Sequence, residues 1–199
     1  MIYSQARTNT EGHAMKYCNL CGSTVRLEIP AGDSRPRHIC NECDEIHYVN
    51  PKVIAGCLPV YEDKVLLCKR SIEPRTGYWT LPAGFMENGE STRQAAARET
   101  LEEANARVSS LQLYTLTSIV PVSQVQMIYL AQLDDLNFFA GDETTDVQLF
   151  SEETVPWDEL AFQTIRNALR FYFEDRKQGI FPLRHVDLKT PPGQYIDKP

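Results

Sequence analysis

The chain has 199 residues, which is enough for one full domain with a small additional module but not for two ordinary domains. Its 42% of hydrophobic and 24% of charged residues are typical of a soluble globular protein. No apolar run approaches the roughly 20 residues of a membrane span, so we expect a cytoplasmic protein with no signal peptide and no membrane partner. The formal net charge of −7 disfavours broad binding to nucleic-acid phosphates, which requires a positive surface.

The acidic side chains are unevenly distributed along the chain. Residues 108–165 contain nine Asp and Glu residues and neither Lys nor Arg. A polyanionic substrate bound near this segment would need positive charge from another source. A metal ion is the most plausible such source.

The first motif in the chain is a pair of Cys-x-x-Cys sequences. Cys18 and Cys21 form one pair, Cys40 and Cys43 form the other, and 18 residues separate the two. This spacing is typical of a four-cysteine zinc site, because each turn presents two thiolates to one tetrahedral ion. Two disulfides are the alternative, which the expected absence of a secretory signal disfavours. Residues 16–50 are therefore predicted to form a zinc ribbon.

Other cysteines and histidines are assigned different roles. His38 and His47 flank the second cysteine pair and are candidates for a ligand or a supporting hydrogen bond, but four thiolates already fill the site. Cys57 and Cys68 lie in apolar runs, and we predict that both are small core residues.

Turn signals and hydrophobic periodicity divide the chain further. Asn50-Pro51 marks a domain boundary, because the residue before proline avoids helical backbone. The expected segments are a disordered polar leader at 1–15, the ribbon at 16–50, a larger domain at 51–180 and an extended tail at 181–199. The expected elements of the larger domain are strands at 53–60 and 65–68, a helix at 91–104, strands at 111–119 and 125–133, and a helix at 161–177. This order predicts a mixed α/β fold with antiparallel hairpins.

The helix at 91–104 has sequence signals at both ends. Ser91 and Gln94 have the spacing of a capping box at the start. Asn105 is suited to the left-handed conformation that ends many helices.

Three carboxylates share one face of this helix near its end. Glu99, Glu102 and Glu103 stand at i, i+3 and i+4, so their mutual repulsion has to be offset. Hard divalent cations such as Mg²⁺ take clustered carboxylate oxygens as ligands. A solvated acidic face is the alternative, and the triplet alone would favour it.

The longer string around these residues resembles the signature of the Nudix hydrolases, G-x5-E-x7-R-E-U-x-E-E-x-G-U, in which U is a bulky aliphatic residue. The matching positions are Gly84, Glu90, Arg98, Glu99, Glu102 and Glu103. The departures are Thr100 and Ala106 at the aliphatic positions and Asn105 in place of the final glycine. The resemblance covers about residues 51–178 and implies the family's α/β/α sandwich with a mixed sheet.

The resemblance also implies a loop–helix–loop that holds Mg²⁺ or Mn²⁺ against a diphosphate. The family's motif assigns the metal to Glu99 and Glu103, with Glu102 nearby and the carbonyl of Ala83 or Gly84 completing the site. Glu90 and Arg98 match a pair that orients the catalytic loop, and Gly84 matches the glycine of that loop.

Family members differ in the carboxylate that takes a proton from water. Within the helix the catalytic candidates are Glu99, Glu102 and Glu103, of which Glu99 or Glu103 would be the base. The candidates in a later loop are Glu143, Asp146, Glu152 and Glu153, of which we favour Glu143.

The substrate class follows from similarity to zinc-ribbon Nudix proteins. The ribbon resembles that of NADH pyrophosphatases, but their S-Q-P-W-P-F-P-x-S stretch is absent from Thr117–Gln124. The chain is more similar to FAD pyrophosphatases of the plant-plastid type, in Tyr48–Lys52, Val65–Arg70, Trp79–Gly84 and Leu160–Phe162. Pro121 is typical of ADP-ribose-type members. The resemblance implies a Mg²⁺-dependent diphosphatase that acts on FAD or ADP-ribose and releases AMP, with NADH as the alternative substrate.

Further candidates concern substrate and partners. Side chains that could bind phosphate or stack on a base are Arg70, Arg75, Tyr78 and Trp79, each equally plausible as a structural residue. The resemblance implies a homodimer. An alternative of another class is a regulator whose ribbon binds nucleic acid and whose Nudix domain senses a ligand. It is disfavoured because Arg35, Arg37 and His38 are the ribbon's only basic cluster.

Overall fold

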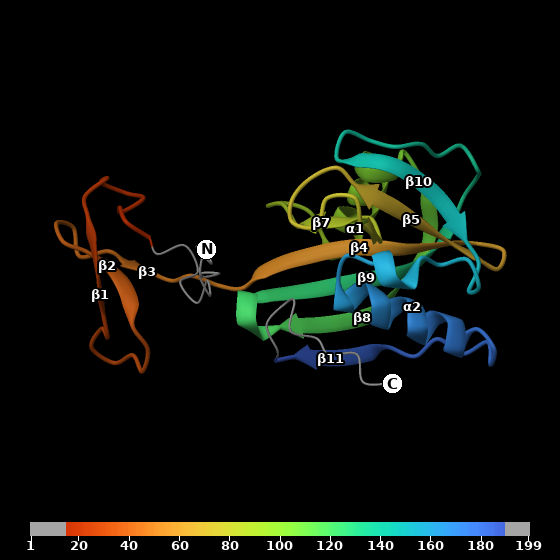
Figure 1. The fold of residues 1–199 in the computed structure, drawn as a ribbon. Coiled ribbons are helices and arrows are strands. Elements are labelled where there is room, and N and C mark those ends of the chain that lie inside the picture. Colours follow the sequence, from red (N-terminus) through yellow and green to blue (C-terminus); the bar gives the residue numbers. More distant parts are fainter. Residues whose placement is uncertain (1–14, 190–199) are drawn as a thin grey trace, which may run out of the picture. The chain divides into compact units, whose positions relative to one another are not determined.

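The computed structural model describes residues 15–189, so the predicted leader at 1–15 lies almost wholly outside the described residues. The chain divides into two compact units between Pro51 and Lys52. The first unit is a three-stranded antiparallel sheet (Figure 1). Its strands are β1 (Val25–Glu28), β2 (Arg37–Cys40) and β3 (Ile46–His47).

The second unit is built on an eight-stranded mixed sheet. Its strands are β4 (Lys52–Tyr61), β5 (Lys64–Arg70), β6 (Trp79–Thr80), β7 (Ala83–Phe85), β8 (Val108–Ile119), β9 (Gln124–Leu133), β10 (Thr144–Phe150) and β11 (Arg184–Leu188). The order is β10-β5-β4-β9-β8-β11, with β6 beside β5 and β7 beside β4. The β4–β9 and β8–β11 pairs are parallel and the other pairs are antiparallel.

Two helices cover opposite faces of this sheet (Figure 1). The helical elements are α1 (Thr92–Ala104), α2 (Gln163–Asp175) and the 3₁₀ turns η1 (Val120–Val122) and η2 (Trp157–Glu159). Cys57 of β4 packs with Ala95 of α1, whereas the next residue, Leu58, packs with Ile165 of α2. Successive strand residues point to opposite faces, so the predicted α/β/α sandwich is confirmed. Among the described residues, neither helix has the length and apolar character needed to cross a membrane.

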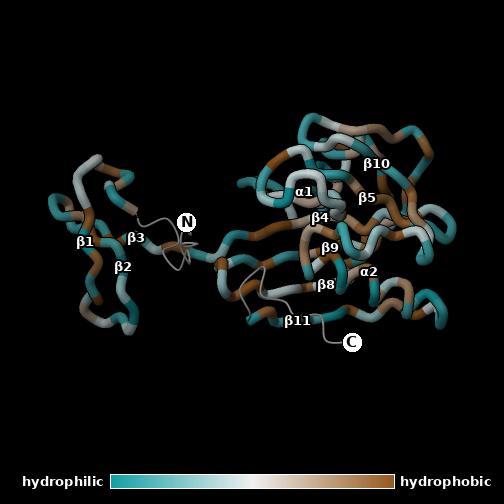
Figure 2. Tube along the Cα trace, in the orientation of Figure 1, coloured by the Kyte–Doolittle hydropathy of each residue, from teal (hydrophilic) through white to brown (hydrophobic). Residues whose placement is uncertain are grey.

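The core is centred on the middle strands. Val65–Cys68 of β5 is fully buried, as is Cys57 of β4, and Figure 2 shows hydrophobic residues along both strands. Each fully buried valine or leucine side chain contributes roughly 1.5–3 kcal/mol to folding. The prediction that Cys57 and Cys68 are core residues is confirmed.

The structure differs from the sequence predictions after α2. The segment predicted as an extended tail at 181–199 contains β11, which pairs in parallel with Thr115–Ile119 of β8. Three of its five residues are polar and Pro182 precedes it, so local propensity does not reveal a strand whose pairing is long-range. Residues 190–199 lie outside the described part of the chain. The helix predicted at 161–177 is slightly shorter, at 163–175.

Candidate functional site

The helix α1 begins with a complete capping box. The Ser91 hydroxyl accepts a hydrogen bond from the Gln94 N–H at 3.3 Å, and the Gln94 side chain accepts one from the Ser91 N–H at 2.8 Å. At the other end, Asn105 adopts left-handed backbone, with φ of 48°, and its N–H donates to the Leu101 carbonyl at 2.8 Å. Both predicted helix ends are confirmed, and they fix where the helical carboxylates lie.

The Arg98 guanidinium connects the loop before α1 to the end of the helix. Its Nε and Nη2 donate to the two carboxylate oxygens of Glu90 at 3.0 and 2.8 Å, and Nη2 also donates to the Phe85 carbonyl at 3.2 Å. These bonds hold the pKa of Glu90 at about 2. Nη1 donates to Glu99 at 2.8 Å and to Glu102 at 3.0 Å. A bidentate pair of this kind fixes direction as well as distance, so Arg98 sets the position of the loop.

Glu99 and Glu103 form a carboxylate pair against β7. Glu103 is only 9% exposed. Burial and the carboxylate of Glu99 raise the pKa of Glu103 to about 8, against the lowering effects of the Ala83 N–H and of Arg70. Burial also raises the pKa of Glu99. A side chain on Gly84 would overlap the Glu99 carboxylate, so a larger residue there would displace the end of the Glu99 side chain.

The chemistry of this donor set fits a hard divalent cation. Among the described residues, Arg98 forms an ion pair with Glu99 at 2.8 Å, whereas Glu103 forms none. The pKa values of both carboxylates are nevertheless raised, so the protein offsets their negative charge only in part. Mg²⁺ takes such oxygens as ligands, so Glu99 and Glu103 are the residues that would hold it. The Glu102 side chain is 57% exposed and pairs with Arg98, which makes it peripheral to the pair. The carbonyl of Ala83 remains a predicted ligand.

Glu103 should make the metal-free protein less stable as the pH rises. Its pKa is about 8 in the folded state against an ordinary value of 4.5, so over this interval the folded state keeps a proton that the unfolded state releases. This contribution to the free energy of unfolding is complete below about pH 4.5 and is lost as the pH approaches 8. Urea unfolding in Mg²⁺-free buffer from pH 5 to 8.5 should show a decline that Glu103→Gln lacks. Equal pH slopes for the two proteins would contradict the expectation.

The loop between β9 and β10 docks on the C-terminal end of α1. The Gly141 N–H donates to the Glu103 carbonyl at 2.9 Å, and a side chain on Gly141 would overlap the Glu102 carbonyl. Glu143 follows two residues later in this loop, and its charge adds to the raised pKa values of both Glu99 and Glu103, which indicates that it lies near the pair. Sequence reasoning missed Gly141, whose only signal was a glycine directly before the acidic loop.

The other acids predicted for the loop have different surroundings. Asp146 lies within β10 and accepts a hydrogen bond from the Gln148 side chain at 2.6 Å. Glu152 forms an ion pair with Arg176 at 3.4 Å, and the Ser151 hydroxyl lowers the pKa of the exposed Glu153. Of the four acids, Glu143 is therefore the one that the structure brings to the carboxylate pair.

Of the predicted substrate residues, Arg70 is the one that acts on the carboxylate pair. Arg70 ends β5, acts on the pKa of Glu103, and donates from Nε to the Pro74 carbonyl at 2.9 Å. Arg75 is exposed in the loop after β5, with its guanidinium 5.3 Å from the centre of the Tyr78 ring. Arg70 therefore approaches the carboxylate pair, whereas Arg75 and Tyr78 contact each other in the loop between β5 and β6.

Trp79, the fourth predicted substrate residue, lies in the core. It is 5% exposed, and its ring meets that of Phe150 edge-on at 4.9 Å. Its carbonyl accepts a hydrogen bond from the Ala161 N–H at 2.8 Å, which joins β6 to the segment before α2. Such burial leaves little ring surface for a nucleotide, so we assign Trp79 to packing.

The four ribbon cysteines converge on one point. Their Sγ atoms lie within 4.8 Å of one another, with 3.7 Å between Cys18 and Cys43 and 3.4 Å between Cys21 and Cys40. A tetrahedral zinc ion with bonds of about 2.3 Å would place its sulfurs about 3.8 Å apart, so the group fits zinc. His47 is buried on β3, outside this group, and its Nε2 has no hydrogen-bond partner among the described residues.

Removing zinc should unfold the ribbon while leaving the larger unit folded. A unit of about 35 residues cannot bury enough surface to fold without a metal or another cross-link. Metal analysis should find one zinc per chain, and a chelator should collapse the amide resonances of residues 16–49 only. Cys57→Ala is the matched control, since it removes a thiol but should keep the zinc. A zinc-free ribbon with unchanged resonances would overturn this assignment.

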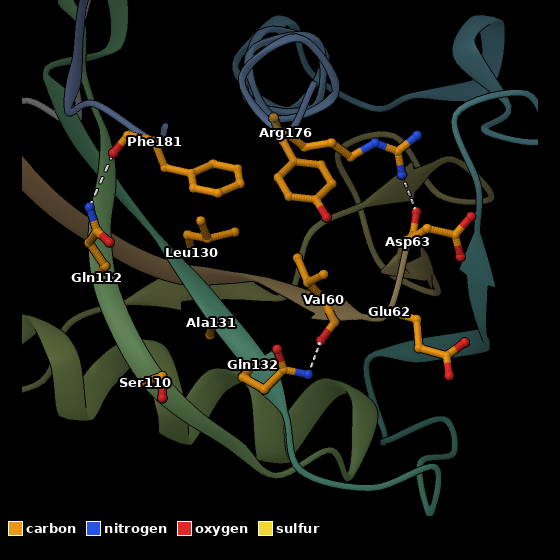
Figure 3. A pocket seen from close by; sticks show the side chains of 11 residues that line it. Val60, Glu62, Asp63, Ser110, Gln112, Leu130, Ala131, Gln132, Arg176 and Phe181 are labelled. Atoms are coloured by element: carbon orange, nitrogen blue, oxygen red, sulfur yellow. Dashed lines mark hydrogen bonds between the residues drawn. The ribbon is translucent and has the colours of Figure 1, made fainter. Parts of the chain in front are cut away.

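The structure also holds a cavity of about 470 Å³ at the end of β4 remote from β7. Figure 3 shows Val60, Leu130 and Phe181 around it, with Arg176 donating to the Asp63 carbonyl at 2.6 Å. None of the predicted catalytic or metal residues lines this cavity. It is therefore separate from the carboxylate site.

Two family models match the chain. Residues 50–177 match the model described as NUDIX domain, and residues 16–49 match the one described as Nudix N-terminal, a zinc ribbon. Among curated proteins, the NAD-capped RNA hydrolase NudC of Photobacterium profundum is 29% identical over 124 residues, which cover 61% of this chain and 44% of that protein. The chain spans about half the length of the curated relatives it matches.

Solved structures give the same fold. A NUDIX hydrolase from Nitrosomonas europaea is 53% identical, with a TM-score of 0.83, over 87% of this chain and 100% of that one. The NUDIX domain of Shewanella oneidensis NrtR, complexed with ADP ribose, has a TM-score of 0.56 and 21% identity over 67% of this chain and 91% of that one. The second likeness shows the fold alone.

Proposed function

Because the chain belongs to the Nudix hydrolase family, we propose that it is a Mg²⁺-dependent diphosphatase that cleaves FAD or ADP-ribose and releases AMP. The observation that supports this most is the carboxylate pair Glu99 and Glu103, with Glu103 nearly buried and Glu143 beside them. Arg98 fixes the loop that faces the pair through its bidentate bond to Glu90. Such a site binds a cation and, through it, a diphosphate.

Each side chain has a distinct role in the proposed reaction. A bound divalent cation would neutralise the diphosphate and make water a better nucleophile. Glu99 and Glu103 would hold that cation, and the Arg70 guanidinium would bind a phosphate oxygen. Glu143 is exposed and close to the pair, so it would take the proton from the attacking water and pass it to solvent. Arg98 would keep the loop in place throughout.

The adenylate part of the substrate is supported by similarity. The segments Tyr48–Lys52 and Trp79–Gly84 are similar to those of FAD pyrophosphatases of the plastid type. NADH is the second candidate, and the names of the curated relatives also favour NAD joined to RNA. Against RNA, two ribbon arginines are already in ion pairs, Arg26 with Glu28 at 3.0 Å and Arg37 with Asp33 at 2.8 Å.

The test is a comparison of substrates with identification of products. FAD, ADP-ribose, NADH and an NAD-capped RNA are each supplied with Mg²⁺, and AMP or 5′-monophosphorylated RNA is measured. We expect kcat/KM to be highest for FAD or ADP-ribose. A tenfold preference for NADH or for the capped RNA would reject the proposed substrate while leaving the diphosphatase activity in place.

A homodimer and a cytoplasmic location belong to the same proposal. None of the six cysteines forms a disulfide in the structure, which agrees with a reducing compartment. Light scattering in solution would give the mass, and a monomer at micromolar concentration would reject the dimer.

A further inference from the structure

A buried amide without a protein partner lies on the sheet face that α2 covers. Gln126 of β9 is 6% exposed, and its Oε1 has no hydrogen-bond partner within residues 15–189. The next residue on the same side of the strand, Ile128, packs in the core with Ile165 of α2. Because an unsatisfied buried polar group destabilises the fold, an apolar side chain would suit this position better. The amide therefore needs a reason other than stability.

The neighbours of Gln126 form an apolar surface with one further polar group. In the strand register Gln126 lies beside Thr117 of β8 on one side and Ile54 of β4 on the other. Thr117 is also buried, at 4% exposure. Beyond Ile54 lies Phe85 of β7, which is 50% exposed. Exposure therefore rises along this row of side chains, from the buried Thr117 and Gln126 through the partly exposed Ile54 to Phe85, with the hydrogen-bonding groups at the buried end.

The same stretch leads to the carboxylate pair. Gln126 and β7 are two strand spacings apart, on the order of 10 Å. Within β7, Gly84 packs against the Glu99 carboxylate, and the Ala83 N–H bonds to Glu103. Glu99 lies on the other face of β7, where Ala83 and Gly84 carry at most a methyl group, so side chains of this strand add little bulk between the two faces. A diphosphate at the pair and a base at Gln126 would then be separated by about the length of one nucleoside.

We propose that Gln126, supported by Thr117, recognises the adenine base of the substrate. The amide oxygen of Gln126 accepts a hydrogen bond from the exocyclic N6 amine of adenine, and its amide nitrogen donates to N7. Glutamine makes the same pairing with adenine in the major groove of DNA. The inference rests on the proposed function, because it presumes a substrate that contains adenine. The inference adds to the proposed function the residue that selects adenine over other bases.

The test uses Gln126→Leu, with Gln132→Leu as the matched control. Gln132 lies on the same strand at the other end of the sheet, is exposed, and donates to the Val60 carbonyl at 3.1 Å. Both variants and the wild type are assayed with ADP-ribose and with 1,N6-etheno-ADP-ribose, in which a bridge to N1 removes both hydrogens from N6, so that N6 cannot donate to the Gln126 amide oxygen. Gln126→Leu should raise KM for ADP-ribose about tenfold with kcat nearly unchanged, and should change KM for the etheno compound less than twofold. Its melting temperature should stay the same or rise, since it removes an unsatisfied buried group.

A titration that needs no turnover separates this inference from the proposed function. AMP should bind Gln126→Leu about tenfold more weakly than it binds wild type or Gln132→Leu, whereas ribose 5-phosphate should bind all three proteins equally. An unchanged KM and AMP affinity, or equal losses for AMP and ribose 5-phosphate, would overturn the role of Gln126. Wild-type protein that binds AMP but hydrolyses no adenine dinucleotide would reject the proposed function alone.

Discussion

Replacing Glu103 with glutamine is expected to lower kcat for diphosphate hydrolysis about 10³-fold. Glu103 is the more buried member of the carboxylate pair, and its amide replacement keeps the shape but removes the charge that would hold Mg²⁺. Initial rates of AMP release at saturating substrate and Mg²⁺ measure the effect. Calorimetric titration with Mn²⁺ should show a matching loss of metal affinity.

Glu102→Gln provides the matched control for that variant. It makes the same change one residue away, on a side chain that is 57% exposed and bonded to Arg98. We expect it to lower kcat tenfold at most, because Arg98 keeps its bonds to Glu90. If Glu103→Gln kept more than a tenth of wild-type activity, or if Glu102→Gln were the more damaging, the assignment of the pair would be wrong.

Gly141→Ala should lower kcat about 100-fold without a change near the metal itself. The added methyl group overlaps the Glu102 carbonyl, so the loop must move away from the end of α1 and take Glu143 with it. A displacement of about 1 Å at a catalytic group typically has an effect of this size. Mn²⁺ affinity should remain within a few-fold of wild type, since Glu99 and Glu103 stay on the helix.

Two further variants show whether the loss in Gly141→Ala comes from displacement of Glu143. Glu143→Gln should reproduce most of the loss, because it removes the base without moving the loop. Gly179→Ala places a methyl group at a left-handed position with φ of 68° and open space around it, so it should cost stability but not kcat. Wild-type kcat in Gly141→Ala, or full activity in Glu143→Gln, would show that this loop does not supply the base.

The sequence predicts well those parts of the site that a local pattern encodes. The ends of α1 follow from Ser91, Gln94 and Asn105, since each acts on backbone groups within one turn. The cysteine pairs likewise predict the four-cysteine cluster, because two short turns need only meet. Both patterns depend on spacing, which the sequence states directly.

The parts that the sequence did not reveal depend on long-range packing. β11 pairs with a strand about 70 residues earlier, and Gly141 matters only because the end of α1 lies against it. Trp79 begins the segment Trp79–Gly84, which resembles the plastid-type FAD pyrophosphatases. Its ring nevertheless packs on Phe150 and not at the carboxylate pair. The roles of β11, Gly141 and Trp79 depend on residues that only the tertiary fold brings next to them. A local sequence pattern does not reveal such neighbours.

The most direct measurement is the release of AMP from ADP-ribose and FAD by wild type and Glu103→Gln, each with and without added Mg²⁺. A site formed by Glu99 and Glu103 around a divalent cation predicts that AMP accumulates only with wild type and Mg²⁺ together. Release of AMP at the same rate without Mg²⁺, or by Glu103→Gln, would contradict that site.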